Sequence, residues 1–150
     1  MNNKNQIYVS WNYDESLAKV VKKPWGKEIW INYRMNEKIG DEEKRYVMKK
    51  LYINKGTKTS FQYHQQKVET NFILKGTLEA WFELNNGSVE KKILKEGSIW
   101  SIPPGVKHRI VTIEDVILLE SSSPEVDDVI RIDDDTVRGN GRILSEHDAN

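Results

Sequence analysis

Four side chains of the kind that bind metal ions fall at fixed places in two short, glycine-bounded segments of the chain. The first segment holds Gln62, His64 and Glu69, and the second ends at His108. Gln62 and His64 are two residues apart, so on a strand their side chains share one face. We expect Glu69 to return on the antiparallel neighbour of that strand and to meet them. Such a set constrains the chain to a small β-barrel built around one metal ion.

The ligand types narrow the choice of metal. Imidazole suits zinc, iron, cobalt, nickel and copper, while a carboxylate and an amide oxygen leave room for exchangeable water or substrate. The chain has no cysteine, and a structural zinc site normally closes its shell with four strong nitrogen or sulfur ligands. We therefore expect one divalent ion in an open site, zinc first, with manganese, iron, cobalt or nickel as alternatives.

A simpler alternative is that His64 and His108 are ordinary polar residues near strand ends. The chain has only three histidines. Two of them would then coincide with the ends of the two segments by chance, which favours the metal interpretation.

Short runs of β-branched and aromatic residues separated by turns fill the chain from residue 27 onward. Asn85-Asn86-Gly87 is typical of a hairpin turn, because asparagine and glycine tolerate positive φ. Repeated short strands predict an all-β antiparallel sandwich or barrel. The expected strands cover residues 28–33, 45–53, 70–74, 78–84, 88–94, 98–102, 108–113 and 116–121.

The length of 150 residues is that of one domain with a single core. We expect an N-terminal arm over residues 1–22, with Asp14 as the N-cap of a short helix over residues 15–21. The barrel domain is predicted to span residues 23–138. Residues 139–150 are predicted to form a loose C-terminal tail.

Composition excludes several classes of partner. Lysine plus arginine equals aspartate plus glutamate at 23 each, so net charge gives no reason to expect nucleic acid or anionic membrane as a partner. No apolar run approaches the ~20 residues of a membrane span, and the first residues lack the apolar core of a signal peptide. The absence of cysteine fits a reducing compartment. Together these features predict a cytoplasmic protein.

Strand alternation assigns side chains to faces of the barrel. If Gln62 points inward, Ser60 does too, whereas Phe61 and Tyr63 point outward and need a cover. Either the N-terminal arm or the second subunit of a homodimer could supply that cover. The same alternation that buries the apolar residues of strand 45–53 also directs Lys49 inward. A lysine there must meet a carboxylate or an anionic ligand, because burying it unpaired is costly.

The two segments resemble the paired motifs of the cupin superfamily. The first reads glycine, five residues, a ligand-x-histidine pair, four residues, glutamate, six residues, glycine, and the second reads glycine, five residues, Pro-x-Gly-x-x-His. The Gln-x-His form is similar to that of phosphomannose isomerases. The likeness extends over residues 23–138 to the C-terminal domain of type II mannose-6-phosphate isomerase/mannose-1-phosphate guanylyltransferase, and it implies a jelly-roll barrel. It is carried by Lys23-Pro-Trp-Gly26, Lys49-Lys-Leu51, Ser60-Phe-Gln-Tyr-His64, Ile102-Pro-Pro-Gly-Val-Lys-His-Arg109 and Asp127-Asp-Val-Ile-Arg131.

The chain departs from the type II pattern in ways that bear on substrate. That pattern has three consecutive histidines where this chain has His64 followed by Gln65 and Gln66. Lys67, two residues before Glu69, is closer to the type I isomerases, in which a lysine at this place is a functional residue. No glycine-rich phosphate loop is present, so nucleotidyl transfer is not supported.

The site and the resemblance together imply a metal-dependent aldose–ketose isomerase acting on a small phosphorylated sugar. The metal would act as a Lewis acid while a base moves a proton between C1 and C2. Lys67, Arg109 and Glu120 are the candidate catalytic residues. Lys67 can serve as the base only if its neighbours, such as the metal and Arg109, lower its pKa toward neutrality, and Glu120 is the other candidate base. The candidate substrate-binding residues are Lys49, Ser60, Trp81 and Trp100.

Alternatives to these roles remain. Lys67 and Arg109 could be solvated rim charges, and Trp81 and Trp100 could belong to the core. A cupin barrel hosts many functions, so a metal-dependent oxygenase and a non-catalytic sugar-binding or sugar-phosphate-binding protein are the two rival hypotheses.

Overall fold

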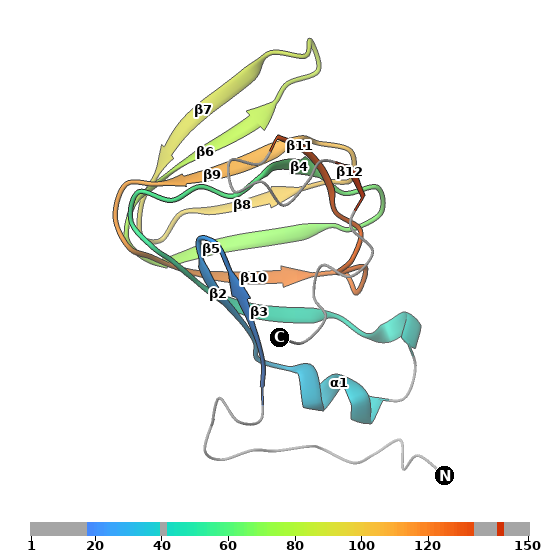
Figure 1. The fold of residues 1–150 in the computed structure, drawn as a ribbon. Coiled ribbons are helices and arrows are strands. Elements are labelled where there is room, and N and C mark those ends of the chain that lie inside the picture. The colour runs from blue at the N-terminus through green and yellow to red at the C-terminus, as the bar shows by residue number, and fades with distance from the viewer. Residues whose placement is uncertain (1–17, 40–41, 134–140, 143–150) are drawn as a thin grey trace.

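The computed structural model describes residues 18–39, 42–133 and 141–142, which form two six-stranded sheets that face each other (Figure 1). All strand pairings within the two sheets are antiparallel. The all-β jelly-roll class is confirmed. Sheet A has the order β1 (Lys19–Lys23), β2 (Gly26–Trp30), β3 (Val47–Ile53), β10 (Val116–Ser122), β5 (Glu69–Lys75) and β8 (Ile99–Ile102). Sheet B has the order β12 (Gly141–Arg142), β11 (Ile130–Asp133), β4 (Phe61–Tyr63), β9 (His108–Thr112), β6 (Leu78–Glu83) and β7 (Val89–Leu94).

The predicted helix over residues 15–21 is wrong in its second half. Lys19 to Val21 lie in β1, which pairs with β2, and residues 15–17 lie outside the described part of the chain. Val20 and Val21 are β-branched and suit a pleated strand better than a helix. The N-terminal boundary therefore carries an edge strand of sheet A.

Two further boundaries differ from the sequence prediction. The strand expected to reach Tyr33 ends at Trp30, and Tyr33 begins helix α1 (Tyr33–Ile39), which is followed by a 3₁₀ turn, η2 (Glu42–Lys44). Asn32 causes the change, because its side chain accepts from Met48 N at 2.9 Å and donates to Tyr46 O at 3.0 Å, in place of a continuing strand. Within the predicted tail, β12 pairs with β11.

No helix in residues 18–39, 42–133 or 141–142 is both long enough and apolar enough to cross a membrane.

The inward faces of the central strands are apolar at one end and polar at the other. Leu51, Ile73 and Leu118, from β3, β5 and β10, belong to the buried core cluster between the sheets. Two residues along, the same faces carry Lys49 and Glu120, which are paired in register across β3 and β10. The core thus fills one end of the barrel, and a buried polar pocket fills the other.

Gly76 closes the turn between β5 and β6 and is the last residue of the first motif. Its φ of +91° is one that side chains disfavour, and a Cβ there would lie 2.2 Å from the backbone oxygen of Asp115. Because backbone cannot move aside cheaply, we expect Gly76→Ala to lower the free energy of unfolding by about 2 kcal/mol or more. Urea denaturation measures this, with Gly87→Ala as a control. Gly87 also has positive φ but has open space around it, so an equal loss in both variants would contradict the steric argument.

Candidate metal centre

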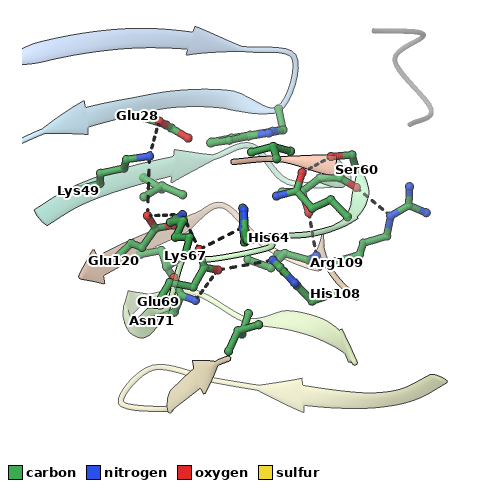
Figure 2. Close-up of a pocket in the computed structure, with 18 of the residues that line it drawn as sticks. Glu28, Lys49, Ser60, His64, Lys67, Glu69, Asn71, His108, Arg109 and Glu120 are labelled. Atoms are coloured by element: carbon green, nitrogen blue, oxygen red, sulfur yellow. Dashed lines mark hydrogen bonds and ion pairs between the residues drawn. The ribbon is translucent and has the colours of Figure 1, made fainter. Parts of the chain in front are cut away.

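His64, Glu69 and His108 meet at the polar end of the barrel. One ligand atom from each lies within 4.8 Å of the others, and all three residues are buried. Glu69 Oε2 is 3.7 Å from His64 Nε2, and Glu69 Oε1 is 3.6 Å from His108 Nε2. Figure 2 shows the two imidazole rings facing the carboxylate. The sequence prediction that these three residues converge agrees with this geometry.

The route by which they converge differs from the expected hairpin. His64 directly follows β4, and His108 lies on β9, which pairs with β4, so both imidazoles come from the side of sheet B. Glu69 begins β5 in sheet A, and β4 and β5 are not neighbours in either sheet. The prediction of antiparallel neighbours is therefore wrong, and the carboxylate instead approaches the imidazoles from the opposite sheet.

Gln62, the fourth predicted ligand, lines the same pocket. It stands opposite His108 in the register of β4 and β9, and its amide oxygen accepts a hydrogen bond from the Ser60 hydroxyl. Ser60 is buried and lines the pocket too, as strand alternation predicts. Gln62 as a ligand stays a prediction.

The donor set fits a divalent cation. The Nδ1 of His64 lies 2.7 Å from Asp128 O, and the Nδ1 of His108 lies 2.9 Å from Val106 O. A carbonyl oxygen only accepts, so in both rings Nδ1 carries the hydrogen and Nε2 presents a lone pair to the pocket. His64 Nε2 is buried and has no hydrogen-bond partner among the described residues. A metal ion would satisfy that atom.

A protein-family model and a curated protein both match this chain. The cupin domain family model matches residues 50–120, which contain all four predicted ligands. Residues 50–120 form a cupin domain. A Vibrio cholerae serotype O1 protein named as a mannose-1-phosphate guanylyltransferase is 28% identical over 117 residues, covering 75% of this chain and 22% of that protein. The chain thus spans about a fifth of the length of that curated relative.

Solved structures support the fold of the cupin. Oxalate decarboxylase from Bacillus subtilis superposes with a TM-score of 0.67 at 16% identity, covering 87% of this chain and 34% of that one. The capsular polysaccharide assembling protein CapF from Staphylococcus aureus gives a TM-score of 0.62 at 13% identity, covering 78% and 33%. At these identities the likeness concerns the fold alone.

Lys67 is the closest cation to the metal ligands of the cupin. Its Nζ lies 2.6 Å from Glu69 Oε2 and 3.2 Å from Glu120 Oε2, and the side chain is buried. Burial alone would lower the pKa of Lys67, but Glu120 and Glu69 outweigh it and raise that pKa well above its ordinary value. The condition for Lys67 to act as the base, a pKa lowered toward neutrality, is therefore not met in the metal-free protein, because two carboxylates contact the ammonium.

Glu69 is held as a carboxylate by the same contacts. Burial would raise its pKa, but Lys67, His108 and His64 lower it below the usual range. Asn71, two residues along β5, also donates to Glu69 Oε1 at 3.3 Å. Each oxygen of the carboxylate thus has a fixed donor, which orients Glu69 toward the imidazoles.

Lys49 points into the cupin barrel, as predicted, and meets carboxylates. Its Nζ is 3.1 Å from Glu28 Oε2 and 3.8 Å from Glu120 Oε2, and its side chain is 1% exposed. The ammonium also lies 4.5 Å from the centre of the Trp30 ring. Its charge is therefore balanced within the protein, and a direct grip on phosphate stays a prediction.

Two predicted site residues direct their functional groups away from the metal ligands. Arg109 contributes to the pocket wall, but its guanidinium donates to Thr59 O at 2.8 Å and to Asp133 O at 3.1 Å (Figure 2). Trp81, beside Arg109 in the register, stacks under Lys91 on the outer face of sheet B and is not among the pocket-lining residues. Because Ala80 belongs to the core, strand alternation directs Trp81 outward, so Trp81 as a sugar platform stays a prediction that the pocket lining does not support. Trp100 does line the pocket.

The sequence analysis proposed no role for two polar residues that line the pocket, Glu28 and Asn71, or for Asp128, which supports the loop beside it. Asn71 had a usable signal, because it follows Glu69 by two residues on the same strand face. Asp128 lies far along the chain, and its carboxylate accepts from the backbone N–H groups of Gln66 and Lys67. Burial would raise its pKa, but these hydrogen bonds lower it. The loop before Glu69 is thereby fixed in place.

A pH dependence follows from the burial of His64. Burial and the charge of Lys67 lower the pKa of His64 to about 4, against about 6.5 in an unfolded chain. Protonation of His64 therefore favours the unfolded chain. The stability that the neutral imidazole contributes is complete above pH 6.5 and is lost as the pH falls through 4. Over this pH window we expect the free energy of unfolding of the metal-free wild-type protein to fall by about 3 kcal/mol more than that of the His64→Gln variant. Urea titrations at pH 7 and pH 4 measure the difference, and equal losses would contradict it.

Proposed function

We propose that the protein is a metal-dependent aldose–ketose isomerase acting on a small phosphorylated sugar, with mannose 6-phosphate as the first substrate to test. The observation that carries the proposal is the buried Lys67–Glu120 ion pair beside the metal ligand Glu69. The pair lies in the same pocket as the Nε2 atom of His64, which has no hydrogen-bond partner among the described residues. An isomerase needs these two features together.

The reaction moves a proton between C1 and C2 of an open-chain sugar through an enediol. A divalent ion held by His64, Glu69 and His108 would supply Lewis acidity toward the carbonyl and hydroxyl oxygens of the sugar. Glu120, as a carboxylate, is the group that can accept the carbon-bound proton. Lys67 keeps its proton and donates hydrogen bonds, so it serves as the acid partner or as a substrate orienter.

Support for a sugar phosphate comes from the named relative rather than from a phosphate-binding contact. The Vibrio cholerae protein is named for chemistry on a mannose phosphate, and this chain matches a fifth of it. Lys49 and Lys67 are both neutralised by carboxylates, so we place the phosphate of the substrate at the mouth of the pocket, outside the metal ligands.

A second candidate is a sugar-phosphate-binding cupin without turnover. The raised pKa of Lys67 favours it, because a protonated lysine is not a base. In this alternative the pocket keeps its metal and its ligand, and Glu120 is only the counter-ion of Lys67 and Lys49.

The test is an isomerase assay on the metal-loaded protein. Protein is stripped with EDTA, reloaded separately with zinc, manganese, iron, cobalt and nickel, and assayed with mannose 6-phosphate and other phosphorylated aldoses. We expect ketose phosphate to form with at least one loaded sample and not with the stripped protein. Saturable sugar-phosphate binding without product would favour the binding protein, and oxygen uptake by the iron sample would favour an oxygenase.

We also propose a cytoplasmic homodimer in which Phe61 and Tyr63, both half-buried on β4, contribute to the subunit contact. Light scattering of the wild-type protein and of a Phe61→Ser/Tyr63→Ser variant measures this. A dimer that persists in the variant would place the contact elsewhere.

A further inference from the structure

Three side chains of the metal pocket come from one short stretch of the chain (Figure 2). His64 and Lys67 lie in the loop between β4 and β5, residues 64–68, and Glu69 begins β5. The residues of this loop belong to no strand, so no ladder of backbone hydrogen bonds holds them in place. The positions of His64 and Lys67 therefore depend on the contacts that the loop makes with the rest of the protein.

The segment that follows β10 supplies such contacts at two places along the loop. Ser123 N donates to Val68 O at 3.0 Å, and Val68 N donates to the hydroxyl oxygen of Ser123 at 3.0 Å. Nearer to the metal ligand, Asp128 Oδ2 accepts from Gln66 N at 2.5 Å and from Lys67 N at 3.1 Å. A segment remote in sequence thus fixes the backbone of the loop.

Asp128 joins this loop to a metal ligand. Its backbone oxygen lies 2.7 Å from Nδ1 of His64, while its carboxylate holds the N–H groups of Gln66 and Lys67. One buried residue therefore contacts both the ring of His64 and the backbone that follows it. Gly105 N donates to His64 O at 2.7 Å and holds the same residue from another loop. A displacement of Asp128 would move the ring and the loop together.

We propose that Asp128 is a positioning residue that sets the metal affinity of the pocket. It is not one of the pocket-lining residues, and its carboxylate is directed at backbone N–H groups. By ordering the loop before the metal arrives, it lowers the entropic cost of binding. It also keeps His64 Nε2 aimed at Glu69, 3.7 Å from Oε2. The inference rests on the metal site of the proposed function.

Three substitutions separate position from charge at residue 128. Asp128→Asn removes the charge and keeps an oxygen that can accept from the two N–H groups. Asp128→Glu keeps the charge and moves the carboxylate by the length of one methylene, and Asp128→Ala removes both features. We expect the alanine and glutamate variants to weaken metal binding by about tenfold or more, and the asparagine variant to stay within about threefold of the wild type.

The probe is cobalt, titrated into the EDTA-stripped full-length protein in competition with a chelator. The visible absorption of bound cobalt gives the affinity, and the shape of its bands reports the coordination geometry. We expect the bands to change in Asp128→Ala and Asp128→Glu and to be retained in Asp128→Asn. A role confined to stability would not move this spectrum.

Asp115→Ala is the matched control. Asp115 Oδ1 also accepts from a backbone N–H group, that of Lys55 at 2.7 Å, and Asp115 lies outside the lining of the metal pocket. We expect this variant to unfold at a lower urea concentration and to bind cobalt as the wild type does. Equal losses of affinity in Asp115→Ala and Asp128→Ala would show that affinity follows overall stability, and would overturn the proposal.

The wild-type affinity and spectrum in Asp128→Ala would overturn it as well. An asparagine variant as weak as the alanine variant, or a glutamate variant as tight as the wild type, would do the same, since either pattern indicates charge in place of position. Where Asp128→Ala does not fold, the asparagine and glutamate variants still decide. A wild type that binds no cobalt would overturn this proposal and the metal site together. None of these measurements needs turnover, so a protein that gives the expected pattern but isomerises nothing would count against the proposed function alone.

Discussion

Replacing His64 or His108 with alanine is expected to leave the purified protein with less than about 0.1 equivalent of divalent metal, where the wild type carries about one. The two Nε2 atoms are aimed at Glu69 from the other sheet at 3.7 and 3.6 Å. Loss of either imidazole removes a strong nitrogen donor and leaves two residues that cannot close the site. Elemental analysis after gel filtration measures metal per protein.

Glu69→Gln is the graded comparison for this experiment. It keeps an oxygen donor but loses the charge, so it should weaken metal binding less than either alanine variant does. His64 and His108 are buried, so circular dichroism of the metal-free variants must show that the barrel persists. Full metal occupancy in folded His64→Ala and His108→Ala would refute the assigned ligands.

Lys67→Met is expected to reduce kcat by about 10²-fold or more while the metal is retained. Its ammonium bridges Glu69 and Glu120, at 2.6 and 3.2 Å. Without it the acid–base pair loses its acid and Glu120 loses its orientation. Removing a positive charge beside Glu69 does not weaken attraction for a divalent ion, so metal content should not fall. Steady-state kinetics and elemental analysis on the same samples measure both quantities.

A partly exposed lysine outside the pocket lining offers the comparison for Lys67. Lys107→Met removes a lysine whose Nζ lies 2.7 Å from Glu83 and which is partly exposed. We expect its kcat to stay within about twofold of the wild type, as for a surface ion pair. Equal, small effects in the two lysine variants would show that Lys67 is a structural charge and would favour the binding protein.

The fold was predictable because strand signals are local. Alternation placed β3, β5, β6, β9 and β10 and correctly turned Lys49 and Ser60 inward. The helix expected before residue 22 failed because pairing with β2, a tertiary contact, decided the conformation of Lys19 to Val21. Short segments at chain ends have weak propensities that such contacts override.

The metal ligands were predictable from motif spacing, but the route between them was not. Residues two apart on one strand share a face in any sheet, whereas the sequence does not say which strand Glu69 will face. The jelly roll places β4 and β5 in opposite sheets. The predicted ligands still meet although they come from opposite sheets, because both sheets direct the ligand side chains inward.

The buried ion pairs behind the metal ligands could not be predicted from the sequence. Glu28, Lys49 and Glu120 come from three strands that are separated in sequence, and only the register of β2, β3 and β10 brings them together. The two carboxylates that raise the pKa of Lys67, Glu120 and Glu69, come from β10 and β5, which are neighbours in sheet A. Charge state at a buried site depends on every neighbour, and most of those neighbours are remote in the chain.

The most direct test of the central claim is isomerisation in deuterium oxide by the metal-loaded wild-type protein. Proton transfer through an enediol exposes the transferred hydrogen to solvent, so nuclear magnetic resonance should detect deuterium at C1 or C2 of the sugar phosphate. We expect label to accumulate with loaded protein and not with EDTA-stripped protein. The absence of both product and label with every phosphorylated aldose tried, in protein carrying one metal per chain, would contradict the isomerase assignment.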